Sequence, residues 1–262
     1  MMASSAERVQ PAELLTVRDL FCSFGGVRAV NGVSFTVSSG SITGLIGPNG
    51  AGKSTVLNMI AGAIKPTAGS ILVDRESIGG LASDQIARRG VVRTFQLPAE
   101  FAQLTVLENL LVAAPDQRGE TLRGALLGKR FWRSEERERI AEARLLLQRF
   151  ALSDKENDRA GNLSGGQKRL LELMRVLMTR PKLLLLDEPM AGVNPSLARE
   201  IATYLLELRS EGYTMLLVEH QLRLVQRLCD DIIVMSQGEI IFQGDMPGLL
   251  RSREVQEAYL AG

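Results

Sequence analysis

The sequence is poor in the residues that build disulfide frameworks and metal centres. Its 262 residues include only two cysteines, Cys22 and Cys229, which lie far apart without a CxxC or Cys/His spacing, and one histidine. This pattern argues against a disulfide-stapled fold and a structural zinc site, and it favours a reducing cytoplasm. We therefore expect a hydrophobic core to stabilise the fold, in keeping with a composition that is 45% hydrophobic.

Long apolar runs and an excess of one charge are also lacking. Apolar stretches such as 183–186 and 232–235 are far shorter than the ~18 residues that a membrane span needs. The 31 basic residues are balanced by 30 acidic ones, so the net charge of +1 does not favour nucleic acid as a partner. Residues 1–11 lack the apolar region of a signal peptide, and we expect a frayed tail there.

The chain does contain a phosphate-binding motif, a P-loop. Residues 47–54 read Gly-Pro-Asn-Gly-Ala-Gly-Lys-Ser, between an apolar run expected as a strand, 42–46, and a helical pattern, 55–61. Glycines let the backbone wrap around phosphates, and the helix N-terminus points N–H groups at them. Lys53 can reach the β- and γ-phosphates, and the Ser54 hydroxyl can ligate Mg²⁺. The alternative is a glycine-rich turn that binds nothing. The expected nucleotide contacts are Gly47, Pro48, Asn49, Gly50, Ala51, Gly52, Lys53, Ser54 and Thr55.

Polar residues follow two further apolar runs. Leu183 to Leu186 predict a buried parallel strand that ends in two carboxylates, Asp187 and Glu188, as a Walker B strand does downstream of a P-loop. Asp187 can hold Mg²⁺, and Glu188 can accept a proton from the attacking water. A solvated loop pair is the alternative. His220 follows the strand expected from Thr214 onward, so it either contacts a γ-phosphate at the same sheet edge or is structural.

Alternating apolar residues predict an antiparallel β layer before the P-loop. We expect strands at 15–20 and 33–37, joined through a turn at Asn31-Gly32. Phe24 stands beside two glycines, where its ring either stacks on adenine or packs in the β core. Further elements are expected as a strand at 91–95, helices at 83–89, 196–208 and 222–229, a hairpin at 237–238 and a closing helix.

Helical periodicity replaces strands between 97 and about 162. We expect Thr105 and Ser134 to cap two helices, the second with a buried stripe at Ile140, Leu147 and Phe150. Residues 122–132 mix basic and aromatic side chains, so they either dock a membrane subunit or lipid headgroups or are buried. Ser164, Gly165 and Gly166 then open an apolar helix at 168–179, either as an anion-binding device or as an ordinary N-cap.

The P-loop, Gln96, LSGGQ at 163–167, LLLLDEP at 183–189 and His220 occur in an order and approximate spacing that resemble ABC-transporter ATPase subunits. The resemblance covers nearly the whole chain from Leu14. It implies an α/β P-loop NTPase fold with a mainly parallel sheet, an N-terminal antiparallel β layer and an inserted α-helical subdomain at approximately 97–175 of an ATPase domain spanning 12–262.

The resemblance also implies roles for individual residues. It implies adenine stacking for Phe24, contact with Mg²⁺ and water for Gln96, and contact with the γ-phosphate for His220. Two ATP molecules would bind between two head-to-tail subunits. The residues implied in catalysis are Glu188, His220, Gln96 and Lys53, those implied in Mg²⁺ binding are Ser54, Gln96 and Asp187, and those implied in contacting the opposite subunit's ATP are Ser164, Gly165, Gly166 and Gln167.

Several segments look like the ATPases of branched-chain amino acid importers: Phe24 to Gly26, the insertion after Gln96, 188–195, Glu219-His220 and the ending 257–262. That family implies permease subunits, a second identical or homologous ATPase, a periplasmic or extracellular solute-binding protein, and a cytoplasmic position on the inner face of the membrane. Asn194 departs from the aspartate that many relatives carry. Lipopolysaccharide-export ATPases are similar in size and ending. A soluble ABC ATPase usually shows paired cassettes or a long coiled coil, which this chain does not have.

Overall fold

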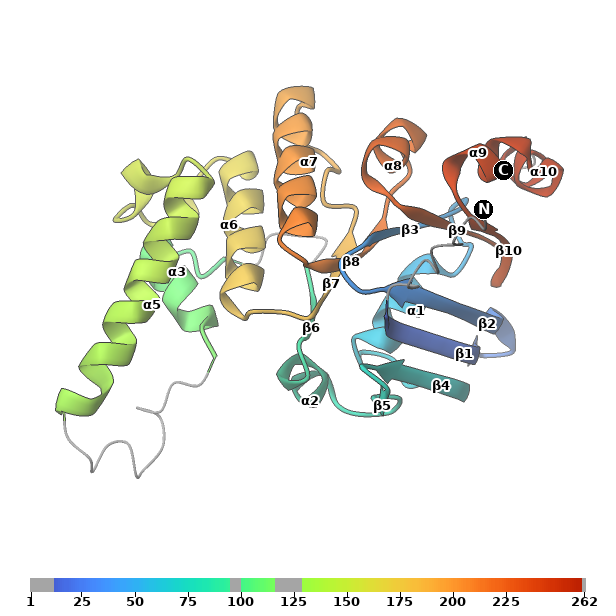
Figure 1. Cartoon of the computed structure of the whole chain (residues 1–262), viewed down its shortest axis with the longest axis horizontal. Helices are drawn as coiled ribbons and strands as arrows, with labels where there is room; N and C mark the ends of the chain where they lie inside the picture. Colours follow the sequence, from blue (N-terminus) through green and yellow to red (C-terminus); the bar gives the residue numbers. More distant parts are fainter. Residues whose placement is uncertain (1–11, 95–99, 116–128, 261–262) are drawn as a thin grey trace, which may run out of the picture. The chain divides into compact units, whose positions relative to one another are not determined.

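The computed structural model describes residues 12–94, 100–115 and 129–260. By its internal contacts the chain forms two compact units, each described separately below. The first unit takes in the residues up to Ser83 and those from Leu206 onward, and the second unit is Asp84–Leu205. Figure 1 gives the labels used for the helices and strands.

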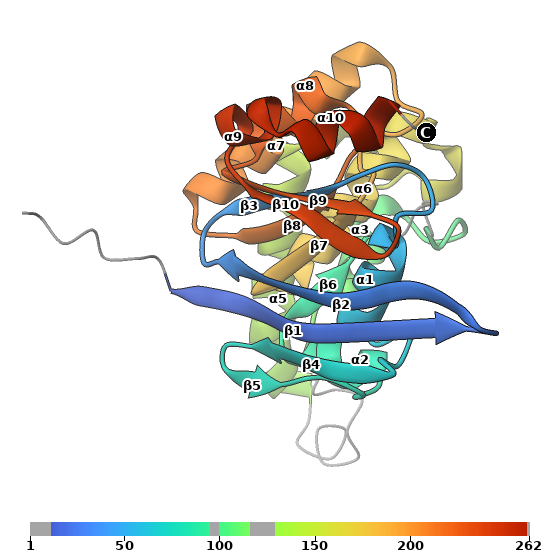
Figure 2. The same ribbon diagram turned by 90° about the vertical axis from the view of Figure 1, so that its right-hand side faces the viewer.

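An antiparallel sheet forms one layer of the first unit, and Figure 2 shows its long strands across the view. Its strand order is β2-β1-β4-β5. The strands are β1 (Glu13–Phe24), β2 (Val27–Ser38), β4 (Ala68–Val73) and β5 (Glu76–Ser77). Alternate residues of β1, such as Leu15 and Val17, are buried, as the period-2 pattern predicts. The predicted antiparallel β layer is therefore confirmed.

The predicted turn at Asn31-Gly32 is wrong, because both residues lie inside β2. Leu20 pairs with Val33 and Phe21 pairs with Asn31, which leaves Gly32 as the extra residue of a β-bulge. Gly32 has a φ of 71°, and its Cα faces the Phe21 ring. The hairpin turns instead at two glycines, 25 and 26, whose positive φ values suit a two-residue loop.

A parallel sheet forms the other layer of the first unit. Strand β3 (Ile42–Ile46) pairs in parallel with β8 (Thr214–Val218) on one side and β9 (Asp231–Ser236) on the other. Strand β10 (Glu239–Gly244) returns antiparallel to β9 through the predicted hairpin at 237–238. Every residue of β3 and β8 is buried, as continuous apolar runs in parallel sheets require.

Helices of the first unit follow these strands. They are α1 (Lys53–Ile60), α8 (Leu222–Leu228), α9 (Met246–Arg251) and α10 (Arg253–Leu260). The single closing helix expected from the sequence is two helices, separated at Ser252. Asp245 caps α9, with its Oδ1 accepting a hydrogen bond from the N–H of Gly248 at 2.8 Å. Leu249 and Val255 bury the apolar side of both helices in a core cluster with Ile46.

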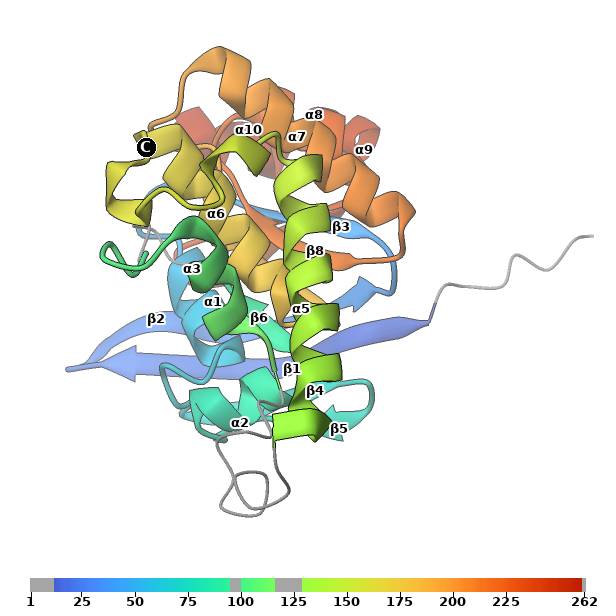
Figure 3. The ribbon, with the colours of Figure 1, turned by 90° about the vertical axis from the view of Figure 1, so that its left-hand side faces the viewer.

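The second unit pairs two strands and is rich in helices, which Figure 3 shows from the side of α5. Strands β6 (Val91–Arg93) and β7 (Leu183–Asp187) are parallel. The α-helices are α2 (Ser83–Arg88, which starts at the unit boundary), α3 (Val106–Ala113), α5 (Lys129–Arg149), α6 (Gly165–Met178) and α7 (Pro195–Ser210, which ends in the first unit). Short 3-10 turns lie at Ser153–Lys155 and Ala160–Asn162.

Helix starts in the second unit test the capping predictions. Thr105 forms a full capping box with Glu108 at the start of α3, which confirms the predicted cap. Ser134 is not a cap, because α5 already begins at Lys129. The five residues from Lys129 to Arg133 include no glycine or proline, so nothing in them prevents an earlier start. Leu147 and Phe150 are buried as predicted, while Ile140 is only half-buried.

Two predictions lie outside the described residues. Gln96 falls in the range 95–99, and most of the segment 122–132 precedes α5. The mixed α/β architecture confirms the predicted fold class, whereas the limits of the subdomain at 97–175 stay a prediction. Among the described helices, none combines the length and apolar character that crossing a bilayer requires.

The two cysteines are free thiols of the first unit, as their spacing predicts. Burial raises the pKa of the Cys229 thiol to about 12, and the nearby Asp230 and Glu219 charges add to the shift. Burial also raises the pKa of Cys22. Because the thiolate is the reactive form, neither side chain is set up for redox or nucleophilic chemistry at neutral pH.

Candidate nucleotide-binding and hydrolysis site

Backbone contacts fix the P-loop between β3 and α1. Gly47, directly after β3, has a φ of 145°, and a Cβ there would overlap the carbonyl oxygen of Met235. Gly52, directly before α1, has a φ of 102°, and a Cβ there would lie 2.5 Å from the carbonyl oxygen of Ala29. Both positions therefore need glycine, and the loop is held against β2 and β9 of its own unit.

Lys53 starts α1 and turns back over the loop. Its side chain is buried, and its Nζ donates hydrogen bonds to the carbonyl oxygens of Gly47 at 2.8 Å and Pro48 at 2.9 Å. The N-cap residue of α1 is Gly52, which has no side chain to cap the first turn, and Ser54, next along the helix, is exposed. A fixed ammonium group beside uncapped N–H groups is suited to bind phosphate.

Phe24 lies at the end of β1, beside the glycine turn. It is 50% exposed, so the alternative that its ring packs in the β core is wrong. From this turn β2 runs to Ala29, whose carbonyl oxygen lies beside Gly52 of the P-loop. An exposed aromatic ring on this hairpin is available to stack on a base.

His220 leaves the first unit's parallel sheet at the same edge as the P-loop. Leu45 of β3 pairs with Val218 of β8, so Gly47 and His220 each lie two residues past this pair. The His220 side chain is exposed, and the backbone N–H of His220 donates to Oε2 of Glu219 at 3.2 Å. His220 therefore lies past the same edge of the first unit's sheet as the P-loop, and its exposure disfavours a histidine buried in the core.

Asp187 ends β7 of the second unit and is fully buried. Its Oδ2 accepts a hydrogen bond from Nη2 of Arg93 at 2.6 Å, and its N–H donates to Oγ1 of Thr94 at 3.5 Å. Within the described part of the chain, Oδ1 of Asp187 has no hydrogen-bond partner. A buried carboxylate oxygen without a donor fits a ligand for a hard cation.

Glu188 follows in a left-handed backbone conformation, with a φ of 47°. This region is costly for a residue with a side chain, and the next residue, Pro189, restricts it further. Its carbonyl oxygen accepts hydrogen bonds from the N–H of Ala191 at 3.0 Å and from Nη2 of Arg169 at 2.8 Å. Glu188 is half-buried, so a solvated loop pair does not describe these two carboxylates.

Ser164 begins α6 with a capping box. Its side chain accepts from the N–H of Gln167 at 3.3 Å, and Oε1 of Gln167 accepts from the N–H of Ser164 at 2.9 Å. The N-cap interpretation is thus confirmed, while an additional anion-binding role stays a prediction. A Cβ at Gly166 would overlap the Leu197 side chain of α7, whereas one at Gly165 would meet open space.

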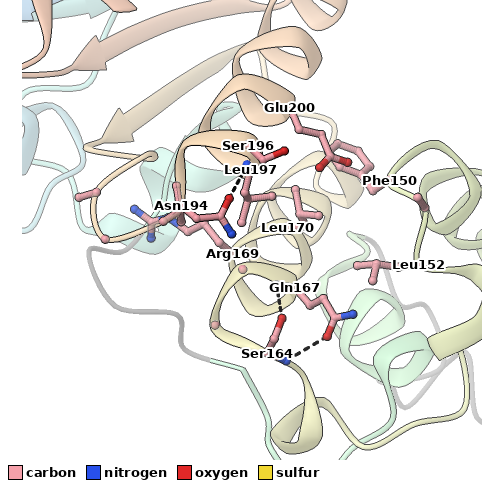
Figure 4. Close-up of a pocket in the computed structure, with 16 residues that line it drawn as sticks. Phe150, Leu152, Ser164, Gln167, Arg169, Leu170, Asn194, Ser196, Leu197 and Glu200 are labelled. Atoms are coloured by element: carbon pink, nitrogen blue, oxygen red, sulfur yellow. Dashed lines mark hydrogen bonds between the residues drawn. The ribbon is translucent and has the colours of Figure 1, made fainter.

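A pocket of about 830 Å³ opens beside this helix start, entirely within the second unit. Figure 4 shows Ser164 and Gln167 at one end of it, with Asn194 and Leu197 above them. Oδ1 of Asn194 accepts from the N–H of Leu197 at 2.9 Å, so this amide supports the start of α7. The neutral side chain of Asn194 therefore has a local structural contact.

Two arginines at the site were not expected from the sequence. Arg93 contacts Asp187, and Arg169 contacts the backbone of Glu188. A charged residue in the short apolar strand β6 signals the need for a buried counter-ion. Arg169 and Glu172 at i, i+3 on a helix rich in leucine signal a buried ion pair, although neither signal reveals the further partner.

Comparison with known proteins agrees with these features. Residues 30–191 match the protein family described as ABC transporter. The chain is 42% identical over 248 residues to the high-affinity branched-chain amino acid transport ATP-binding proteins BraF of Pseudomonas aeruginosa and LivG of Escherichia coli, covering 94% of this chain and 97% of each relative. It is 38% identical over 252 residues to a probable protein of this kind from Methanocaldococcus jannaschii, covering 95% of this chain and 97% of the relative.

Solved structures are similar as well. A nucleotide-free ATP-binding cassette from an ABC transporter has a TM-score of 0.81 and 38% identity, over 95% of this chain and 99% of that one. The ADP conformation of an ATP-binding cassette of an ABC transporter has a TM-score of 0.81 and 37% identity, over 96% of this chain and 100% of that one.

Proposed function

The chain belongs to the ABC transporter family of ATP-hydrolysing subunits, and we propose that it energises the uptake of branched-chain amino acids. The observation that carries the choice of solute is the 42% identity over 94% of the chain to two branched-chain amino acid transport ATP-binding proteins. This likeness favours amino acid uptake over lipopolysaccharide export and over a soluble ABC ATPase.

In the proposed mechanism the P-loop binds the triphosphate. The N–H groups at the start of α1 and the ammonium of Lys53 bind the β- and γ-phosphates, at the cost of the lysine's present bonds to Gly47 and Pro48. The Phe24 ring stacks on the adenine, which its 50% exposure supports. Most of the nucleotide's binding free energy is thus assigned to the first unit.

We propose that the ATP is bound with Mg²⁺. The residues fit such an ion, because Asp187 offers a carboxylate oxygen without a hydrogen-bond partner among the described residues and Ser54 offers an exposed hydroxyl. Gln96 completes the proposed set but lies outside the described residues. When bound, Mg²⁺ neutralises charge on the phosphates as the terminal phosphoryl group is transferred.

Glu188 is the proposed general base. Its carboxylate accepts or steers the proton of the attacking water, the water oxygen bonds to the γ-phosphorus, and the bond to the β-phosphate oxygen breaks to leave ADP and phosphate. His220 is assigned a γ-phosphate contact, supported by its exposed position past β8.

Two ATPase subunits, identical or homologous, are proposed to share each ATP. Ser164 and the glycines after it would contact the ATP held by the partner's P-loop, which is supported by the exposure of Ser164 and Gly165 beside the pocket. We also propose permease subunits, contacted through 122–132, and a solute-binding protein on their far side. This arrangement would place the chain in the cytoplasm, on the inner face of the membrane.

Transport by the assembled complex tests the proposal. Reconstituted with its permeases and binding protein, the parent chain should drive ATP-dependent uptake of radiolabelled leucine into vesicles. Glu188→Gln should lower ATP turnover by about 10²–10⁴-fold, the usual contribution of general-base assistance, with ATP affinity unchanged. The exposed Glu211→Gln is the matched control. Parent-like turnover in Glu188→Gln would contradict the proposed role of Glu188 as the base. ATPase activity that no branched-chain amino acid stimulates would contradict the proposed solute.

A further inference from the structure

Arg169 is a buried arginine close to the start of α6, two residues after Gln167. Its side chain is 9% exposed. The guanidinium group spreads over three acceptors: Nε donates to the carbonyl oxygen of Pro189 at 3.0 Å, Nη2 to that of Glu188 at 2.8 Å, and Nη1 to Oε2 of Glu172 at 2.8 Å. Two of its bonds thus hold the main chain that directly follows β7.

The held segment has a backbone conformation that needs support. Glu188 has a φ of 47° and precedes a proline, and both conditions disfavour its backbone conformation. Such conformations persist only when the surroundings over-determine them. The carbonyl oxygen of Glu188 also accepts from the N–H of Ala191, so the turn and Arg169 together fix the peptide plane after Glu188.

The charge of Arg169 is balanced on its own helix. Glu172 lies one turn further along α6, is itself buried and forms an ion pair with Arg169. Buried ion pairs add little stability over apolar residues of similar volume, so their retention is better explained by geometry than by stability. The planar guanidinium can bond two adjacent carbonyl groups and a carboxylate at once, which an ammonium group does less well.

We propose that Arg169 is a positioning residue, which orients Glu188 and ties it to the helix that begins at Ser164. The inference rests on the proposed role of Glu188 as the base. Because Arg169 is near the N-terminus of α6, a phosphate bound at that N-terminus and the backbone of the base are linked through less than two helical turns. Glu172 keeps the guanidinium oriented.

Steady-state kinetics of the full chain, alone and in the assembled transporter, test this role. The pair variant R169M/E172M removes both charges at similar volume, and R169K keeps the charge without the planar fork. We expect kcat to fall about 10- to 100-fold in the pair variant, as small misplacement of a reacting group does, with ATP affinity by calorimetry unchanged. We expect a smaller fall in kcat for R169K. The bidentate pair of the exposed Arg144 and the half-buried Glu156 supplies the control R144M/E156M, which should leave kcat unchanged.

A double-mutant cycle with E188Q separates positioning from general damage. If Arg169 acts through Glu188, adding R169K to E188Q lowers single-turnover hydrolysis no further than E188Q alone. Multiplicative losses, or parent-like kcat in R169K and a folded pair variant, overturn the inference. If the pair variant does not fold, the kcat of R169K and its cycle with E188Q test the inference without it. Parent-like turnover in E188Q itself would instead show that Glu188 is not the base. The error would then lie in the proposed role of Glu188 and not in the contacts of Arg169.

Discussion

The P-loop of the first unit and the Asp187–Glu188 segment of the second unit are built differently, and we propose different roles for them. The P-loop is a continuous stretch whose side chain Lys53 bonds to its own loop. Asp187 and Glu188 depend on side chains far along the chain, since Arg93 lies 94 residues before Asp187 and Arg169 lies 19 residues before Glu188. Binding is thus assigned to local backbone geometry, and catalysis to long-range side-chain contacts.

The largest effect should come from removing the one charge of the P-loop. Lys53→Ala deletes the ammonium that we propose binds the phosphates, and charge-assisted hydrogen bonds contribute about 1.5–3 kcal/mol each. We expect ATP affinity to fall about 100-fold or more, with negligible hydrolysis and an intact fold. Calorimetry measures it, with the exposed Lys65→Ala as the control. Equal ATP affinity of Lys53→Ala and the parent would contradict the proposal that the P-loop binds ATP.

In the second unit, the loss of a buried ion pair should mainly lower the thermal stability of the protein. Arg93→Met leaves the fully buried Asp187 without its ion-pair partner. Removing one partner of a buried pair costs several kcal/mol, here about 3 because Arg93 is partly exposed. Mg²⁺-ATP should restore the lost thermal stability, so its addition should raise Tm more in the variant than in the parent. Arg88→Met, from the exposed pair with Asp84, is the control. Equal Tm shifts would contradict a role for Asp187 in binding the ion.

Two glycine substitutions should differ in their effect on the stability of the protein. Gly47→Ala should destabilise the protein by about 1–3 kcal/mol, because the residue has a φ of 145° and a Cβ would overlap Met235. Gly165→Ala should not, since its Cβ would meet open space and alanine is the better helix former. Thermal unfolding of both variants measures the difference. Equal stability of the two variants would show that close backbone approach does not distinguish these loops.

The smallest expected effect is at the edge of the first unit. Phe24→Ala should weaken ATP binding by ~1–3 kcal/mol, the usual contribution of aromatic stacking on a base. Tm should stay at the parent value, because the ring is 50% exposed. Val27, 69% exposed across the same turn, supplies the control Val27→Ala. A lower Tm with parent-like ATP affinity would indicate that the Phe24 ring packs in the core.

The sequence predicts most of the local structure at the site. The strand 42–46, the P-loop and the helix after it appear as expected, because glycine spacing and apolar periodicity are local signals. The buried strand that ends at Asp187 follows the same logic. The N-cap at Ser164 is also local, since its partner Gln167 is three residues away.

Long-range contacts account for what the sequence does not predict. The sequence predicts a hairpin turn at Gly32, but this residue forms a β-bulge. The pairing of β2 with β1 and the contact with Phe21 determine its conformation. Ser134 reads as a cap, although α5 starts five residues earlier. The contacts of Arg93 and Arg169 could not be assigned, since a charged residue in an apolar segment reveals that it needs a partner but does not reveal which one.

We propose that one subunit's P-loop and the other subunit's Ser164 helix start share each ATP. Light scattering of Glu188→Gln in ATP and Mg²⁺, alone and with the second ATPase subunit of the assembled transporter, reports whether ATP makes the subunits associate. Because this variant should bind ATP without consuming it, we predict an ATP-dependent dimer, about twice the 28.6 kDa mass of the chain when the partner is identical. A chain that binds ATP with parent affinity yet shows no ATP-dependent association in either setting would contradict the claim.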